Sequence, residues 1–349
     1  MRRLPVFFVL DCSESMAGDN LAKMEQGIGM IIRNLRQDPY ALETACLSVI
    51  AFAGIAKTIA PLVEVASFYP PRLPLGGGTA LGAALTELMK QIDAQVVRSS
   101  PDRKGDWKPI VYLLTDGKPT DKMEFALKRW RSEYADRATI IAIAVGRYAD
   151  IAALQQITDT VLLFEEQTED DFKKFISWIS SSISFQSKSV TEGQPEGALL
   201  PGTGGNVVSL LKHDNLPHLF TDQDCVVLTG RCQNTGKAYL MKYDRLQNVV
   251  QLRKDRQGAK HYRLTGCYTL SEEYFEWSSH GAEHALVNTD DLIGTPGCPY
   301  CGNGSAFAMC GCGKLMCIDG PGDAACPWCK AEVSFSGSGQ DFDVRRGRG

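Results

Sequence analysis

The sequence lacks several features that would assign a function directly. It has no run of about 18 apolar residues, so we expect no membrane-spanning helix. Its five histidines are scattered, and none begins the His-Glu-x-x-His pattern of a zinc protease. The glycine-rich segment 202–205 is not followed by Gly-Lys-Ser/Thr and lacks the lysine of a phosphate-binding loop. These absences argue against a membrane protein, a zinc protease and a P-loop enzyme.

The chain also lacks a strong excess of charge of either sign. Its formal net charge is -4, with 37 basic and 41 acidic residues among 349. This balance gives no general reason to expect binding to nucleic acid or to an anionic membrane. The first ten residues resemble a signal peptide, but the apolar run is short and no small-residue cleavage site follows. We therefore expect a cytoplasmic protein, and the length favours two or three domains.

Three short segments carry oxygen-bearing side chains in positions that favour a metal site. The first is Asp11-Cys12-Ser13-Glu14-Ser15, the second contains Thr79, and the third is Thr115-Asp116-Gly117. Each segment follows a predicted strand or opens a predicted helix. Carboxylates and hydroxyls are the ligands that a hard cation such as Mg²⁺ prefers, in near-octahedral geometry with some positions left for water. A carboxylate or phosphate of a partner could complete such a shell.

The order of these segments resembles the metal-ion-dependent adhesion site of the von Willebrand factor A (VWA) family, whose motif is D-x-S-x-S, a Thr and then Thr-Asp-Gly. A single D-x-S-x-S is more typical of a helix N-cap, so the prediction depends on the ordered triple. The resemblance implies that Ser13, Ser15 and Thr79 bind Mg²⁺ or Mn²⁺ directly. It implies that Asp11 and Asp116 bind the cation directly or through water.

The spacing of apolar residues predicts an α/β domain over residues 1–186. Alternating strands and helices argue for a doubly wound, mostly parallel, Rossmann-like sheet that is covered on both faces. Ligands of such sheets bind beyond the carboxyl ends of the strands, where two of the motif segments fall. Strands are predicted at 5–10, 44–52, 55–65, 109–114, 139–145 and 161–164, and helices at 20–35, from 79, at 125–134 and at 170–185.

The sequence changes character after this domain. Residues 187–206 contain Pro- and Gly-rich turns with few large apolar residues, so we predict a linker. Residues 207–293 contain short predicted strands with polar turns, which indicates a small β-rich module. Three cysteines of this module are expected to be buried thiols of a reduced protein rather than metal ligands: Cys225, Cys232 and Cys267.

Residues 294–333 hold seven of the twelve cysteines and predict a zinc-ribbon-like module. A hairpin over 307–318 is expected between two Cys-x-x-Cys knuckles. We predict that the knuckles bind a first zinc ion through four thiolates: Cys298, Cys301, Cys326 and Cys329. The other three cysteines could hold a second zinc with a ligand such as Asp319, exchange with the knuckles in an interleaved arrangement, or be free thiols: Cys310, Cys312 and Cys317.

The combination of both regions is more specific than either alone. A VWA domain followed by Cys-Pro-x-Cys-Gly and Cys-Pro-Trp-Cys is similar to the TerY family of bacterial tellurite-resistance and stress-response systems. The resemblance implies a scaffold that operates with a protein kinase and a protein phosphatase. The final residues 334–349 are rich in Gly, Ser and Arg, and we expect them to be disordered.

Three hypotheses of function follow. The leading one is a cytosolic interaction scaffold, not an enzyme, whose metal captures an acidic or phosphorylated partner. The second is a nucleic-acid-binding protein that uses the zinc ribbon and the basic C-terminal tail. Against it, the charge is mixed and the chain has no basic stripe with interleaved aromatic residues. The third is a metal-dependent hydrolase. Only Glu14 and Cys12 stand beside the motif as catalytic candidates, and we expect Glu14 to point to solvent and Cys12 to face the sheet.

Overall fold

The computed structural model describes residues 2–102, 104–116, 118–146, 149–165, 168–191, 208–210, 225–246, 261–279, 286–336 and 341–345. The chain divides into two compact units. The first unit consists of Met1–Cys12, Asp19–Pro74 and Thr79–Leu219. The second consists of Ser13–Gly18, Leu75–Gly78 and Phe220–Gly349. Two short segments from the N-terminal half of the sequence therefore belong to the second unit.

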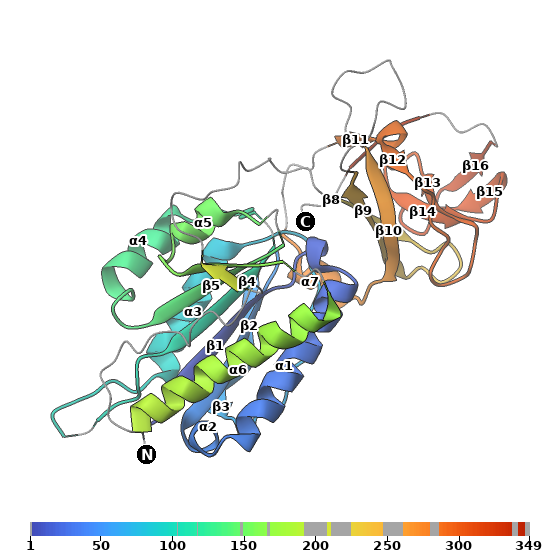
Figure 1. The fold of residues 1–349 in the computed structure, drawn as a ribbon. Coiled ribbons are helices and arrows are strands. Elements are labelled where there is room, and N and C mark those ends of the chain that lie inside the picture. Colours follow the sequence, from blue (N-terminus) through green and yellow to red (C-terminus); the bar gives the residue numbers. More distant parts are fainter. Residues whose placement is uncertain are drawn as a thin grey trace. The chain divides into compact units, whose positions relative to one another are not determined.

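A seven-stranded sheet forms the core of the first unit, in the order β3-β2-β1-β4-β5-β6-β7 (Figure 1). β1 (Leu4–Asp11) pairs in parallel with β2 and β4, and all residues of these three strands are buried. This is expected for strands that are covered on both faces. Only β3 and β7, at the edges, run antiparallel to their neighbours. The other strands are β2 (Ala45–Phe52), β3 (Ala56–Glu64), β4 (Ile110–Thr115), β5 (Thr139–Val145), β6 (Val161–Phe164) and β7 (Val208–Leu210).

Alternating side chains of β1 contact two layers of helices. Phe7 and Val9 lie in one buried cluster with residues of α3 and α4. Phe8 points to the opposite face, where its ring stacks on Tyr112 of β4 with 5.7 Å between centroids. The Tyr112 hydroxyl donates to Ser182 of α6 at 3.0 Å. The helices are α1 (Asp19–Gln37), α2 (Pro39–Thr44), α3 (Leu81–Gln95), α4 (Glu124–Glu133), α5 (Ile151–Gln155) and α6 (Glu169–Thr191).

Helices α1 and α6 pack against each other along their length (Figure 1). Asn34 of α1 donates to Ser180 of α6 at 3.1 Å. A Cβ at Gly27 would lie 2.7 Å from Ile176 Cδ1, so glycine allows the close approach of the two helices. In the part of the chain that the structure describes, no helix combines the length and apolar character that crossing a membrane requires.

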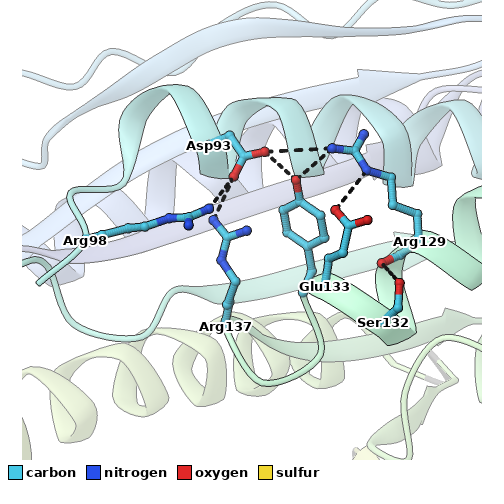
Figure 2. A network of polar contacts seen from close by, with 7 residues as sticks. Asp93, Arg98, Arg129, Ser132, Glu133 and Arg137 are labelled. Atoms are coloured by element: carbon cyan, nitrogen blue, oxygen red, sulfur yellow. Dashed lines mark hydrogen bonds and ion pairs between the residues drawn. The ribbon is translucent and has the colours of Figure 1, made fainter.

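A polar network joins the C-terminal ends of α3 and α4 (Figure 2). Asp93 of α3 accepts hydrogen bonds from the Tyr134 hydroxyl and from Arg137, the latter at 2.7 Å, and Arg98 donates at 3.1 Å. Arg129 and Arg137 lie 5.4 Å and 4.5 Å from the centroid of the Tyr134 ring. Burial acts to raise the pKa of Asp93, but the hydrogen bonds from Tyr134 and Arg137 outweigh it and lower this pKa. The ionised carboxylate therefore links the two helices.

The second unit is built on a six-stranded sheet in the order β12-β10-β9-β8-β14-β13. β8 and β9 form an antiparallel hairpin, and β14 pairs in parallel with β8. Val226 of β8, Tyr239 of β9 and Leu315 of β14 lie in one buried cluster. The elements are β8 (Cys225–Arg231), β9 (Ala238–Arg245), β10 (Tyr262–Thr269), α7 (Glu273–Trp277), β11 (Leu286–Asn288), β12 (Leu292–Ile293), β13 (Ser305–Met309), β14 (Leu315–Ile318), β15 (Gly322–Ala325), β16 (Glu332–Phe335) and β17 (Asp343–Arg345).

This sheet corrects the expected division of the C-terminal half. Residues 207–293 and 294–333 were predicted as separate modules, but strands from both segments share the sheet and its core. The β13–β14 hairpin between the knuckles is present as predicted. Residues 294–333 are too few to bury a sizeable core by themselves, and sharing a sheet with strands from 207–293 gives them one.

The expected disorder of the final segment is wrong for its described part. β17 pairs antiparallel with β11, and Val344 is buried. The ring of Phe342 stacks on Phe307 with 5.8 Å between centroids. Backbone pairing with β11 and the apolar contacts of Phe342 and Val344 hold this part of the segment, and all these partners lie far away in the sequence. The terminal residues 346–349 lie outside the described residues.

The first five residues of the predicted linker are helical. Helix α6 continues to Thr191, so residues 187–191 are helical, and Ser187 is fully buried. Several predicted features lie outside the described residues: the linker residues 192–206 with the glycine-rich segment 202–205, Gly117 of the third motif segment, and the histidines 213, 218, 280 and 284.

Candidate metal centres

The C-terminal edge of the first unit's sheet carries three of the five predicted adhesion-site ligands. Asp11 is the last residue of β1, and Asp116 directly follows β4, the parallel neighbour of β1. Thr79 reaches the same edge because the N–H of Ala80 donates to the carbonyl of Ala53, just beyond β2, at 2.6 Å. The fold therefore brings these three residues to the edge where parallel α/β sheets bind their ligands.

The backbone of Thr79 is held in place, whereas its hydroxyl is not used. Its N–H donates to Thr120 Oγ1 at 2.8 Å, and the N–H of Thr120 donates to the carbonyl of Thr79 at 2.9 Å. Thr79 is fully buried, and among the described residues its Oγ1 has no hydrogen-bond partner. Leaving a buried hydroxyl unsatisfied costs about 1–3 kcal/mol. A cation bound by this oxygen would offset that cost, so Thr79 fits the predicted ligand set.

Two further residues support the predicted ligands at this edge. Asp11 is buried and accepts a hydrogen bond from the hydroxyl of Thr115, which orients the carboxylate. Asp121 accepts from the N–H groups of Gly82 and Ala83 at 3.1 Å and 2.8 Å, and so caps the start of α3 from a distant segment. Sequence reasoning missed Asp121, because no local motif marks a carboxylate that caps a helix elsewhere in the chain.

The two motif serines belong to the second unit. Ser13 and Ser15 have hydroxyls 2.9 Å apart that share a hydrogen bond. Glu14, which lies between them, is only 1% exposed and accepts a hydrogen bond from the hydroxyl of Tyr274. The prediction that Glu14 points to solvent is therefore wrong. A variable position in a motif says nothing about a tertiary partner that is 260 residues away.

Cys12 is fully buried, as predicted for a side chain that faces the sheet. Burial raises the pKa of its thiol well above the usual range, and the neighbouring Asp11 carboxylate raises it further. The nucleophilic form of cysteine is the thiolate, so a buried neutral thiol is a poor nucleophile. This environment argues against a hydrolase that would use Cys12.

Eight cysteines of the second unit form two groups of four, and within each group all the Sγ atoms lie within 4.8 Å of one another. The first group is Cys232, Cys298, Cys301 and Cys317, and the second is Cys310, Cys312, Cys326 and Cys329. This corrects the predicted first quartet of Cys298, Cys301, Cys326 and Cys329, because the two knuckles fall in different groups. Of the alternatives left open, the structure supports the interleaved arrangement, and Asp319 belongs to neither group.

The distances between sulfur atoms fit tetrahedral zinc sites. Sγ–Sγ distances are 3.7 Å for Cys301 and Cys317, 3.7 Å for Cys310 and Cys329, and 3.9 Å for Cys312 and Cys326. A tetrahedron with zinc–sulfur bonds of about 2.3 Å has edges of about 3.8 Å. A disulfide would require about 2.05 Å, and none of the cysteines forms one. Each group therefore has the donor set and spacing of one zinc site.

A shared type of backbone turn positions the thiols. The N–H of Cys298 donates to the carbonyl of Asn303 at 2.8 Å, and the N–H of Gly302 donates back to the carbonyl of Cys298 at 3.1 Å. Cys326 begins a turn of the same kind, in which Lys330 takes the place of Gly302. Gly302 and Lys330 have φ values of 75° and 65°, in the left-handed region. This conformation lets both cysteines of a knuckle face one side.

Cys232, which was predicted to be a buried thiol and not a ligand, begins a turn of the same kind. Its N–H donates to the carbonyl of Lys237 at 2.9 Å, and the N–H of Gly236 donates back at 2.8 Å. Thr235 occupies the place of the second cysteine of a knuckle. The spacing from Cys232 to Gly236 repeats that of the Cys-Pro-Tyr-Cys-Gly segment 298–302. This spacing is the signal that could have identified Cys232 from the sequence.

One thiol in each group has a lowered pKa. Burial acts to raise the pKa of Cys232, but hydrogen bonds with Thr235 outweigh it and lower this pKa to about 7. Burial also acts against ionisation of Cys326, but the backbone N–H groups of Cys329 and Trp328 lower its pKa to about 7. Zinc binds the thiolate, so in each group the turn favours the metal-binding form of this one cysteine.

The fold and the cysteine groups define a protein that joins a VWA-type α/β domain to a cysteine-rich metal-binding module. Residues 6–178 match the von Willebrand factor type A domain family, and residues 222–349 match the TerY-C metal binding domain family. Because it combines both domains in this order, the chain belongs to the TerY-like family. No curated protein matches the chain.

Several solved structures match about half of the chain, each with a TM-score below 0.5. A von Willebrand factor type A protein from Catenulispora acidiphila is 17% identical, with a TM-score of 0.41, over 52% of this chain and 43% of that chain. Proximal thread matrix protein 1 from the mussel byssus, with a zinc-occupied MIDAS motif, is 20% identical with a TM-score of 0.37, over 53% and 46%. BatB from Bacteroides thetaiotaomicron is 17% identical with a TM-score of 0.36, over 51% and 98%. The chain spans less than half the length of the first two.

Proposed function

We propose that the protein is a cytoplasmic, metal-dependent interaction scaffold and not an enzyme. Mg²⁺ or Mn²⁺ would be held by the residues of the adhesion motif and would capture a carboxylate or phosphate of a protein partner. The observation that carries the proposal is the buried hydroxyl of Thr79, which has no hydrogen-bond partner in the described part of the chain. The proposed ligands are Asp11, Ser13, Ser15, Thr79 and Asp116.

The chemistry of this donor set favours an anionic partner. The motif supplies carboxylates only from Asp11 and Asp116, and its other three ligands are neutral hydroxyls. Hard cations prefer oxygen ligands and readily keep positions for water or for substrate oxygens. With five protein ligands, a near-octahedral cation would keep one open position, which a negatively charged oxygen from outside the chain would fill. A glutamate, an aspartate or a phosphorylated side chain offers such an oxygen.

The TerY-like family supports a more specific proposal for the partners. We propose a protein kinase and a protein phosphatase, which would place the scaffold in a phosphorylation-linked stress or tellurite-resistance system. In this proposal the adhesion site docks one partner. The second unit, with a zinc ion in each cysteine group, docks the other partner or braces the site. Zinc binding would supply much of the folding energy of that unit.

A metal titration of the purified protein tests the adhesion site. The protein is dialysed free of Mg²⁺ without a chelator, so that zinc is retained, and then titrated with Mn²⁺ by calorimetry. We expect one Mn²⁺ per chain, bound about tenfold more weakly by Thr79→Ala, which corresponds to about 1.4 kcal/mol. Thr86→Ala is the matched control, because the Thr86 hydroxyl is bonded within α3 to the carbonyl of Gly82. Equal affinity of Thr79→Ala and the wild type would show that Thr79 is not a ligand.

A co-purification experiment tests the partners. Tagged wild type and an Asp11→Ala, Thr79→Ala double variant are purified from native host cells with Mg²⁺ present, and bound proteins are identified by mass spectrometry. We expect a kinase or a phosphatase to be lost from the double variant only. If both forms retain the same partners, the metal site is not the binding surface.

A further inference from the structure

One segment of the adhesion motif and one that adjoins it pack within the second unit. Residues 13–18 contain the two motif serines, and residues 75–78 directly precede Thr79 in the sequence. Ser13 and Gly76 form a parallel bridge, so the two segments also contact each other. One apolar cluster holds both segments together with residues from the C-terminal half: Ala17, Leu75, Val227, Ala238, Leu240, Leu270 and Tyr274.

Tyr274 of α7 contacts the first segment from within this cluster. Its hydroxyl donates a hydrogen bond to Glu14, the residue between Ser13 and Ser15. Tyr274 is 5% exposed and Glu14 is 1% exposed, so water is excluded from the bond. A hydrogen bond to a carboxylate is stronger than one between neutral groups, and low exposure strengthens it further. Lys242 adds a second contact, because its Nζ donates to the carbonyl of Ser15 at 2.5 Å.

The C-terminal end of α7 holds the second segment. The N–H of Gly77 donates to Ser278 Oγ at 2.8 Å, and the N–H of Ser279 donates to the carbonyl of Gly77 at 2.9 Å. Gly76 lies directly against Trp277, since a Cβ at Gly76 would be 2.6 Å from the Trp277 carbonyl oxygen. The segment is therefore fitted to the helix end at a separation that only glycine allows.

Helix α7 is itself attached to the second cysteine group. The ring of Phe275 meets Trp328 edge to face, with 6.4 Å between centroids. Trp328 lies between Cys326 and Cys329 in the sequence, and its Nε1 donates to the carbonyl of Leu315 at 2.8 Å. The cysteine group, α7 and the two motif segments thus form one continuous set of contacts in the second unit.

We propose that Tyr274 and Ser278 are positioning residues of the adhesion site: α7 holds residues 13–18 and 75–78 in the conformation that binds the metal. The second unit then contributes to metal binding at the adhesion site. A partner that displaces α7 would weaken this binding. This inference rests on the proposed function of the motif.

A double-mutant cycle tests the positioning role. Mn²⁺ affinity is measured for the wild type, Tyr274→Phe, Glu14→Ala and the double variant. We expect about a fivefold loss for Tyr274→Phe. Because both changes break the same bond, Tyr274→Phe should add nothing to the loss caused by Glu14→Ala. Tyr243→Phe is the matched control, since it removes another buried tyrosine bond of the same unit, to the carbonyl of Gly294 at 3.1 Å. It should lower the melting temperature without changing Mn²⁺ affinity.

Hydrogen exchange separates the failure of this inference from the failure of the proposed function. Amide exchange of residues 13–18 and 75–78 is compared in Tyr274→Phe and Tyr243→Phe, both without added Mn²⁺. Faster exchange of these segments in Tyr274→Phe alone supports the positioning contacts, even if the wild type binds no Mn²⁺ and the proposed function fails. The inference is overturned if both variants exchange alike in these segments. It is also overturned if the wild type binds Mn²⁺ and Tyr274→Phe binds it with the same affinity.

Discussion

Thr79 and Thr120 bind each other through reciprocal hydrogen bonds: the N–H of Thr79 donates to Thr120 Oγ1 at 2.8 Å, and the N–H of Thr120 donates to the carbonyl of Thr79 at 2.9 Å. The next residue, Asp121, caps α3 at Gly82 and Ala83. One short loop therefore sets both the position of Thr79 and the start of the helix that follows it. The position of the Thr79 hydroxyl therefore depends on Thr120 and Asp121, which lie outside the adhesion motif.

This relationship predicts that Thr120 affects metal binding without being a ligand. Thr120→Ala removes the side-chain bond to the N–H of Thr79 and costs about 1 kcal/mol, so we expect about a fivefold loss of Mn²⁺ affinity in calorimetric titration. Thr120→Ser keeps the hydroxyl and should retain most of the affinity. Equal affinities for the alanine and serine variants would contradict the prediction.

The first cysteine group predicts that Cys232 is a zinc ligand. Cys232→Ser should lower the zinc content from two ions per chain to one, because the group then has three thiolates. Zinc is measured by plasma mass spectrometry of the protein after gel filtration. Cys225→Ser is the control, since Cys225 belongs to neither group and should retain two zinc ions. Two zinc ions in Cys232→Ser would refute the assignment.

The interleaved arrangement makes a further prediction about pairs of substitutions. Cys298→Ser with Cys301→Ser removes two ligands of one group, so one zinc ion should remain bound. Cys298→Ser with Cys326→Ser removes one ligand from each group and should weaken both sites. The single-quartet arrangement predicts the same zinc loss for both pairs. Zinc content together with competition by a chromogenic chelator distinguishes the two arrangements.

An ion pair at the start of β1 predicts acid sensitivity of the first unit. Arg3 donates to both carboxylate oxygens of Asp106, at 3.0 Å and 2.6 Å, and the N–H of Val97 donates to the same carboxylate at 2.8 Å. Burial acts to raise the pKa of Asp106, but the bonds from Arg3 and Val97 outweigh it and lower this pKa. The ionised carboxylate therefore stabilises the fold above the unfolded pKa of about 3.9, and this contribution is lost as the pH falls through the lower folded pKa.

Asp106→Asn should reduce the free energy of unfolding by about 1–2 kcal/mol at neutral pH, because the charge-assisted bonds are weakened. Urea unfolding at neutral pH and near pH 3 measures this loss, and the difference from the wild type should shrink at the lower pH. Asp136→Asn is the control, because Asp136 is exposed. A constant difference at both pH values would show that ionisation of Asp106 is not the source of the stabilisation.

Local patterns in the sequence were sufficient for much of the fold and of the site. Apolar periodicity predicted most strands and long helices of the first unit, because burial on one or both faces imposes it directly. Short helices were missed, since six residues of α2 carry too little periodicity. The signal for α2 was its cap: Asp38 accepts from the N–H of Ala41 at 2.9 Å, and Pro39 follows.

The tertiary structure alone decided which of these residues act together. A knuckle fixes where its two thiols point, but the partner knuckle is chosen by which strands pair, and β8 brings Cys232 beside Cys317, 85 positions later. The same holds for Glu14 and Tyr274, whose bond joins two distant segments. The turn of a knuckle depends on neighbouring residues, whereas burial and the pairing of distant segments depend on the whole chain. The ligand types could thus be predicted from the sequence, and their grouping could not.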